Sequence, residues 1–262
     1  GLGGGFAKVG ADGSVEFLTD GHIYDLILPG FSEKVKLGLN VGRDFIEIPV
    51  LYERPVAGDL ISGRAVGEIM RTVDRKMLSD GKPPVFLPFV KIKRGDGSFA
   101  SFLEASDVEV KEILSHENVD SPLNARLLNV ELLGKPDSKD YQRAFGVAEQ
   151  IAVFEGRMLA KIVECVYTGN IVKSAVQAEW PAEDVEKVRG TTRFIIGGSV
   201  GTAGALGEVV RNTARSELSK SFPDVDFVLQ EIKGSTADLG AIGASMFIPK
   251  RELEKEAGSL TS

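Results

Sequence analysis

The most informative stretch of the chain reads Thr192-Arg193-Phe194-Ile195-Ile196-Gly197-Gly198-Ser199-Val200-Gly201-Thr202-Ala203-Gly204. Its short apolar run ends at two glycines, and apolar residues then recur at helical spacing: Leu206, Val209, Val210, Ala214 and Leu218. The pattern predicts a buried strand, a glycine turn and an amphipathic helix over Ala205 to Lys220. In open α/β sheets, ligands bind beyond the carboxyl ends of strands, where such turns lie. The alternative is an ordinary strand-to-helix turn, because short glycine motifs are weak evidence.

A second strand and a helix of small residues follow near the end of the chain. Asp226 to Ile232 has the pattern of a short strand, and Lys233-Gly234-Ser235-Thr236 that of a turn. The next segment, Ala237 to Phe247, consists largely of small residues, which let a helix pack closely on a sheet or a ligand. This part of the chain therefore predicts an alternation of strands and helices, which is typical of an α/β fold.

This order of motifs resembles the adenosine-binding end of the sugar kinase, actin and Hsp70 superfamily, and within it the ROK-type sugar kinases. The resemblance is carried by Gly197-Gly198-Ser199 after one strand and by Asp238-Leu239-Gly240-Ala241-Ile242-Gly243-Ala244 after the next. It implies an α/β fold of the ribonuclease-H-like (actin-like ATPase) type, with a mixed central sheet and helices on both faces. Residues 1–262 would form one domain, like the C-terminal, nucleotide-binding and dimer-forming half of such a kinase.

Earlier motifs occur in the order that this resemblance leads us to expect. The glycine-rich start, Gly1 to Gly13, ends in the hairpin signal Asp12-Gly13, between predicted strands at Phe6–Val9 and Ser14–Leu18. Backbone amides of such a loop suit phosphate oxygens, although composition alone favours a flexible chain end.

Two long helices are predicted downstream. A helical stripe covers Asp59 to Leu78 and includes Ser62-Gly63, and a second covers Lys139 to Tyr167. The second is apolar on more than one face and should therefore be a central, buried helix. ROK-type kinases place a similar long helix before the adenosine-binding strand.

The remaining segments predict shorter elements. We expect strands at Ile23–Leu28 and Phe45–Leu51, and helices at Asp107–His116, capped by Ser106, and from Ser121 to Leu133. Residues 83–103 predict a hairpin that turns at Asp96-Gly97 and has no counterpart in the ROK pattern, so we interpret it as an insertion.

Composition limits the classes of function. The net charge of −7, with no basic block, argues against a nucleic-acid partner. Cys165 is the single cysteine, which excludes an internal disulfide and a cysteine-rich zinc site, and we predict no bound structural metal. No apolar run is long enough for a membrane span and no signal-peptide pattern is present, so we expect a cytoplasmic protein that does not enter membranes.

The resemblance also implies a nucleotide site for ATP or ADP with Mg²⁺. Gly3, Gly4 and Gly5 would face the β- and γ-phosphates. The adenosine pocket would be lined by Gly197, Gly198 and Ser199, and Asp238 and Gly240 would lie near the nucleotide. The partners implied are a small sugar, the nucleotide and a second copy of the chain.

Three features depart from the family. The first phosphate loop and the catalytic aspartate belong to the half that precedes the glycine loop, and nothing precedes it here. We therefore assign no catalytic residue, expect the aspartate in a missing N-terminal half, and predict negligible turnover for this chain alone. The cysteine-rich zinc motif and the Gly-Glu-Ile-Gly-His sugar-binding signature are also absent.

Two other interpretations remain open at this stage. The chain could be a non-catalytic module that keeps the same fold for nucleotide or sugar sensing and for dimerisation. It could also be an unrelated α/β enzyme that binds a nucleotide or coenzyme at Gly197 and Gly198, although the spacing after Gly198 does not match the Gly-x-Gly-x-x-Gly dinucleotide motif.

Overall fold

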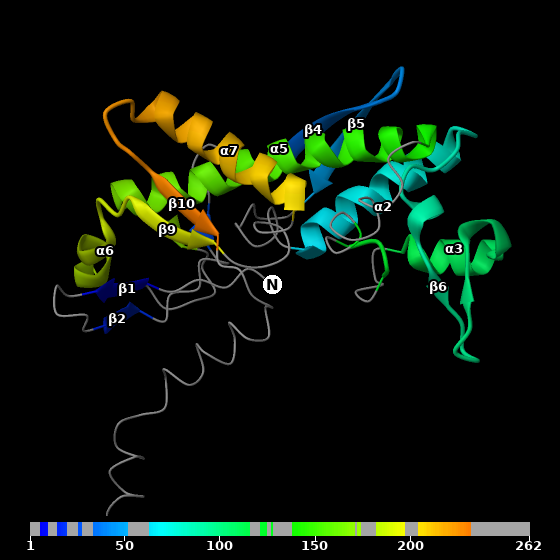
Figure 1. The fold of residues 1–262 in the computed structure, drawn as a ribbon, viewed down its shortest axis with the longest axis horizontal. Coiled ribbons are helices and arrows are strands. Elements are labelled where there is room, and N and C mark those ends of the chain that lie inside the picture. The colour runs from blue at the N-terminus through cyan, green and yellow to red at the C-terminus, as the bar shows by residue number, and fades with distance from the viewer. Residues whose placement is uncertain are drawn as a thin grey trace, which may run out of the picture.

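The protein combines long helices with short two-stranded sheets (Figure 1). The computed structural model describes residues 6–9, 15–19, 26–27, 34–51, 63–115, 121–124, 127, 138–170, 172–173, 182–196 and 204–231. In chain order the described elements are β1 (Phe6–Val9), β2 (Val15–Thr19), β3 (Leu26–Ile27), β4 (Lys34–Val41), β5 (Asp44–Leu51), α2 (Gly63–Ser79), the 3₁₀ turn η2 (Leu87–Phe89), β6 (Ile92–Lys93), β7 (Phe99–Ala100), the 3₁₀ turn η3 (Phe102–Glu104), α3 (Asp107–Ile113), α5 (Lys139–Thr168), β8 (Val172–Lys173), α6 (Ala182–Val188), β9 (Arg193–Ile196), α7 (Gly204–Ser221) and β10 (Val228–Glu231). The predicted α/β class is confirmed.

The strands of the described residues pair two by two: β1 with β2, β3 with β8, β4 with β5, β6 with β7, and β9 with β10. Only the last pair is parallel. The predicted single mixed sheet with helices on both faces is not seen within these residues, and it stays a prediction. No helix among the described residues is both long and apolar enough to cross a membrane.

Helix α5 is the central element. It has 30 residues, and its buried side chains lie on more than one face, as its sequence predicted: Ala144, Val147, Ala148, Ile151, Ile162, Val163 and Val166. Ser138 caps its first turn by accepting a hydrogen bond from the Tyr141 N–H. Gly169 ends it in the left-handed conformation, at φ 70°.

The helix carries two hydrophobic clusters. The first core cluster joins α5 to β4, β5, α2 and the first turns of α7. The second core cluster joins the last part of α5 to α7 and to the strand pair β9–β10: Ala160, Val163, Ala214, Leu218, Phe227 and Leu229. Helix α5 therefore connects the part that contains β4, β5 and α2 with the part that contains β9 and β10.

The β4–β5 hairpin packs against α5 through alternate side chains. Leu37, Leu39 and Val41 of β4 are buried, and the hairpin turns at Gly42, which has φ 66°. The Gln150 side chain fixes its position, because it accepts from the Asn40 N–H at 2.8 Å and donates to the Asn40 carbonyl at 2.9 Å. The sequence prediction found β5 but missed β4.

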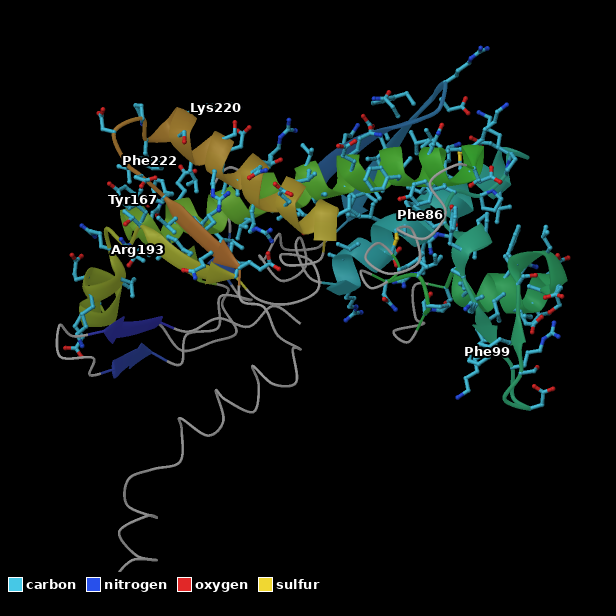
Figure 2. All side chains as sticks on the ribbon, in the orientation of Figure 1. Phe86, Phe99, Tyr167, Arg193, Lys220 and Phe222 are labelled. Carbon is cyan, nitrogen blue, oxygen red and sulfur yellow. The ribbon has the colours of Figure 1, made fainter. Side chains whose placement is uncertain are left out.

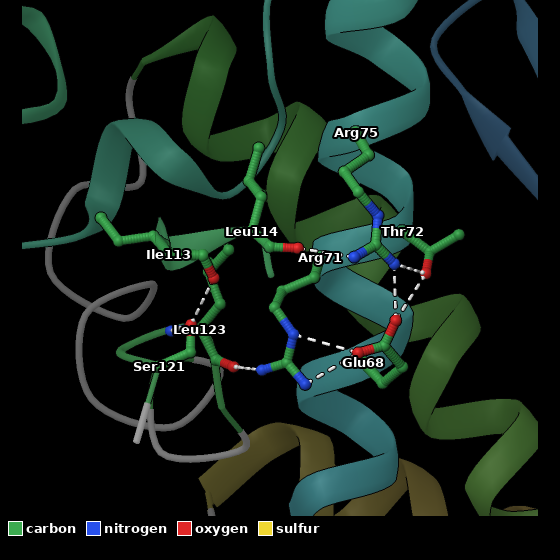
Figure 3. A network of polar contacts seen from close by, with 8 residues as sticks. All are labelled: Glu68, Arg71, Thr72, Arg75, Ile113, Leu114, Ser121 and Leu123. Carbon is green, nitrogen blue, oxygen red and sulfur yellow. Dashed lines mark hydrogen bonds and ion pairs between the residues drawn. The ribbon is translucent and has the colours of Figure 1, made fainter. Parts of the chain in front are cut away.

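Helix α2 is tied to its surroundings by charged side chains (Figure 3). The Glu68 carboxylate accepts hydrogen bonds from Arg71 and Arg75, and Arg71 also donates to the Leu123 carbonyl at 3.4 Å. Burial would raise the pKa of Glu68, but the hydrogen bonds from Arg75 and Arg71 outweigh it and lower that pKa. The predicted helix from Asp59 to Leu78 is confirmed from Gly63 onward, and residues 59–62 lie outside the described part.

The predicted hairpin at 83–103 exists but is short. Its strands β6 and β7 have two residues each, and the turn is the predicted one at Asp96-Gly97, with Gly97 at φ 83°. The flanking residues form η2 and η3 instead of longer strands. One reason is that the Ser101 hydroxyl and amide are held by the Glu104 carboxylate, which starts a helical turn.

Two of the shorter predicted helices gave different outcomes. Helix α3 is confirmed, and Ser106 caps it as expected, with Glu109 completing a capping box. The predicted helix start at Ser121 is wrong, because residues 121–124 are not helical. There the Ser121 hydroxyl donates to the Ile113 carbonyl and accepts from the Leu123 N–H, which stabilises a turn.

Asp74 of α2 organises the segment before the short hairpin. Its fully buried carboxylate accepts hydrogen bonds from the backbone N–H groups of Val85 (2.6 Å), Phe86 (3.1 Å) and Leu87 (2.7 Å). Burial raises the pKa of Asp74 to about 6, although these hydrogen bonds oppose the rise.

The Asp74→Asn variant should be less stable than the wild type at pH 7 by about 1–3 kcal/mol, because one amide oxygen replaces two carboxylate oxygens. The folded-state pKa of about 6 lies above the ordinary value of 3.8, so protonation favours the folded state as pH falls. When the pH is lowered from 7 to 5, the free energy of unfolding of the wild type should therefore rise by about 1 kcal/mol relative to that of the variant. Urea unfolding at both pH values measures this difference. Asp224→Asn, at an exposed turn, should follow the wild-type curve, and equal pH dependence of all three proteins would contradict the prediction.

Candidate functional site

The candidate site lies at one edge of the parallel strand pair β9–β10. The two strands run in register from Arg193 opposite Val228 to Ile196 opposite Glu231, so their carboxyl ends are level. Helix α7 connects them and lies alongside the pair (Figure 1). The predicted strand, helix and second strand are confirmed, each within two residues of its expected bounds.

Apolar packing explains why this unit forms. Phe194 and Ile196 of β9 pack against the second core cluster, to which α7 contributes Ala214 and Leu218. The aromatic rings of Tyr167 and Phe222 meet at the far end of the unit, with centroids 5.0 Å apart (Figure 2). The helical spacing read from the sequence therefore matches the buried face of α7.

Polar contacts tie α7 to β10. The Arg211 guanidinium forms an ion pair with Glu231, the last residue of β10, with N and O atoms 3.0 Å apart. Arg215, one turn later, donates to the Leu229 carbonyl at 2.6 Å. These contacts fix the carboxyl end of β10 relative to the first half of α7.

Helix α7 also approaches α5 very closely, at Gly156. A Cβ at this position would lie 2.6 Å from the Val210 carbonyl oxygen and 2.6 Å from the Thr213 Cβ. Only glycine fits without a shift of one helix. The close contact sets the place where α7 begins relative to α5.

Five of the predicted nucleotide-binding residues follow β9 or β10 in the sequence, and the other three precede β1. Gly197, Gly198 and Ser199 directly follow β9, and Asp238 and Gly240 follow β10 after a few residues. Gly3, Gly4 and Gly5 directly precede β1. All eight positions lie outside the described residues, so their predicted roles stay predictions.

The β9–α7–β10 unit suits one kind of ligand group. Parallel strands direct the segments that follow β9 and β10 to the same edge. Helix α7 begins at Gly204, eight residues after the end of β9, and its first turn offers N–H groups without intrahelical partners. The arrangement suits an anionic ligand group close to the strand ends.

Sequence reasoning missed Glu155 of α5. Its side chain is buried, at 1% exposed, and neither carboxylate oxygen has a hydrogen-bond partner within the described part of the chain. Burial raises the pKa of Glu155 well above its ordinary value. A signal was present in the sequence, because Glu155 lies four residues after Ile151 and seven before Ile162, on an apolar face.

A hollow of about 300 Å³ lies where α5, α7 and β4 meet. Its lining includes Lys36, Lys161 and Glu217, and each of these forms an ion pair with a neighbouring side chain. Its charges are therefore largely matched within the protein. No cluster of three or more metal-ligating side chains is found within the described residues.

Comparison of the chain with models of protein families, with curated proteins and with solved structures finds no match. The resemblance to ROK-type kinases therefore rests on the order of the sequence motifs.

Gly156→Ala should destabilise the protein by about 1–3 kcal/mol, because the added methyl group forces α5 and α7 apart. The matched control is Gly146→Ala in the same helix, where the new Cβ meets nothing within 4 Å. That control should be neutral or more stable by up to about 1 kcal/mol, since alanine is the better helix former. Urea unfolding of both variants gives the comparison, and equal stabilities would show that the close approach is not needed.

Proposed function

We propose that this chain is the nucleotide-binding large domain of an ATP-dependent sugar kinase of the ROK type, and that the assembled enzyme phosphorylates a sugar hydroxyl. The observation that supports the proposal most is the β9–α7–β10 unit, in which the two strands are parallel and end at the same level. In the sequence, Gly197 and Gly198 directly follow β9. Nucleotides commonly bind at such an edge in α/β proteins. The actin-like ATPase fold is part of the same proposal.

The proposal assigns roles by resemblance. Gly197, Gly198 and Ser199 line the adenosine pocket, Asp238 and Gly240 lie near the nucleotide, and Gly3 to Gly5 face the β- and γ-phosphates. Mg²⁺ enters with the nucleotide and neutralises phosphate charge. The structural support on this chain's side is the start of α7 at Gly204, whose first turn offers backbone donors, in the helix that joins β9 to β10.

Catalysis requires more than this frame. Phosphoryl transfer depends on groups from two domains that close on the substrate, including an aspartate that accepts the proton of the sugar hydroxyl. By resemblance that aspartate belongs to an N-terminal half, so the catalytic residue is not assigned to this chain. The proposed homodimer would form through this domain, and the protein would be cytoplasmic, with no nucleic-acid or membrane partner.

A non-catalytic module of the same fold is the second candidate. It is favoured by the absence of the Gly-Glu-Ile-Gly-His sugar-binding signature from residues 1–262. Such a module would bind a nucleotide or a sugar and dimerise without transferring phosphate.

Titration calorimetry with Mg-ADP tests the shared premise of nucleotide binding. The wild type should bind saturably, and Gly198→Val should lose at least about tenfold in affinity, or 1.4 kcal/mol, because a side chain obstructs the adenosine pocket. Gly95→Val is the matched control, since a Cβ at Gly95 meets nothing within 4 Å and the site lies in the remote β6–β7 turn. It should bind like the wild type. No binding to the wild type, or equal binding to all three proteins, would contradict the proposal.

A further inference from the structure

Glu155 is a buried acid that no structural role explains. Both carboxylate oxygens lack a hydrogen-bond partner within the described residues, and they are the only buried side-chain oxygen or nitrogen atoms there in that state. A buried polar group without a partner destabilises the folded state, and a charged group does so more strongly. Such groups in a folded protein commonly mark a functional site.

Glu155 lies next to the contact between α5 and α7. Leu159, one turn further along α5, packs against both core clusters. The first core cluster includes Leu206 and Val210 from the first turns of α7, and Ile196 at the end of β9 packs against the second. Glu155 precedes Gly156, which touches α7 directly. Glu155 therefore lies on the part of α5 between the residues that pack against the first turns of α7 and those that pack against the β9–β10 pair.

The direction of β9 supports the same placement. The Gly190 N–H donates to the Tyr167 carbonyl at 2.9 Å, so the chain enters β9 beside the C-terminal end of α5. From there β9 runs back toward the middle of the helix (Figure 1). Glu231, which is opposite Ile196, forms an ion pair with Arg211, and Arg211 follows Val210, whose carbonyl oxygen faces Gly156. The carboxyl end of β9 is thus about level with Glu155.

The chemistry of a buried, unpaired carboxyl narrows the ligand class. Burial favours the neutral acid, whose O–H donates and whose carbonyl accepts a hydrogen bond. Its complement is a group that presents an acceptor and a donor side by side. The 6-amino group and the adjacent ring nitrogen of adenine form such a pair, and a fully desolvated partner of this kind discriminates strongly between bases.

We propose that the Glu155 carboxyl hydrogen-bonds the adenine base of a nucleotide bound at the carboxyl edge of the β9–β10 pair. This inference rests on the proposed function, because it assumes that the edge binds an adenine nucleotide. It adds a base-reading residue on α5, an element outside the predicted glycine motifs.

Titration calorimetry of the full chain tests the inference with two ligands, Mg-ADP and the Mg complex of purine riboside diphosphate, which lacks the 6-amino group. The wild type should bind ADP at least about tenfold more tightly than the analogue. Glu155→Gln keeps a donor and an acceptor and should retain ADP affinity within about threefold. Glu155→Met removes both and should lose the discrimination. Glu149→Met, at an exposed position of α5, is the matched control and should bind like the wild type.

The outcomes separate the two proposals. Failure of the wild type to bind Mg-ADP would overturn the proposed function and this inference with it. If the wild type binds ADP and Glu155→Met keeps both the affinity and the preference over the analogue, the inference is wrong and the proposed function stands. Thermal unfolding of each variant verifies its fold. If Glu155→Met does not fold, an absence of discrimination in the wild type, or a Glu155→Gln variant that loses ADP affinity, would still overturn the inference.

Discussion

The close contact between α5 and α7 is the constraint on which the described structure depends. Helix α5 carries both core clusters, and α7 reaches it because Gly156 has no side chain in the way. The contact fixes the start of α7 near the middle of α5. From that point the ion pair of Arg211 with Glu231 and the hydrogen bond from Arg215 determine where β10 lies. The geometry of the candidate site therefore follows from packing that takes place outside it.

The β9–β10 pair that this packing positions forms the edge of the candidate site. Because β9 and β10 are parallel and end level, the chain leaves both strands at one edge, where Glu231 pairs with Arg211 in the first half of α7. Parallel pairs with a helical crossover place ligands at this edge in many unrelated proteins. Glu155 precedes the glycine at which α5 contacts α7 and is a buried polar group among apolar residues of α5. The proposal of an adenine nucleotide joins these features in one site.

The elements that could be predicted are those whose own side chains determine them. Helices α5 and α7 and strands β9 and β10 were found because apolar periodicity sets their buried faces. Strand β4 was missed although Val35, Leu37 and Leu39 alternate, since glycine and polar residues between them weakened the signal. The hairpin at 83–103 is shorter than expected because distant Asp74 captures the N–H groups of residues 85–87.

The site was predictable to a lesser degree. The elements around it, β9, α7 and β10, could be predicted, because each has a recognisable pattern of apolar residues in its own sequence. Local sequence marks Glu155 as an acid on an apolar face, but its lack of a partner depends on which distant residues cover that face of α5. Tertiary contacts of this kind have no local signature.

Hydrogen–deuterium exchange of the chain with and without Mg-ADP tests the central claim most directly, because it reports where a ligand acts. Nucleotide binding at the β9–β10 edge should slow exchange in β9, in the first turns of α7 and in β10, and leave exchange in the β6–β7 hairpin unchanged. Unchanged exchange in those segments, or slower exchange only around the hollow lined by Lys36, Lys161 and Glu217, would contradict it.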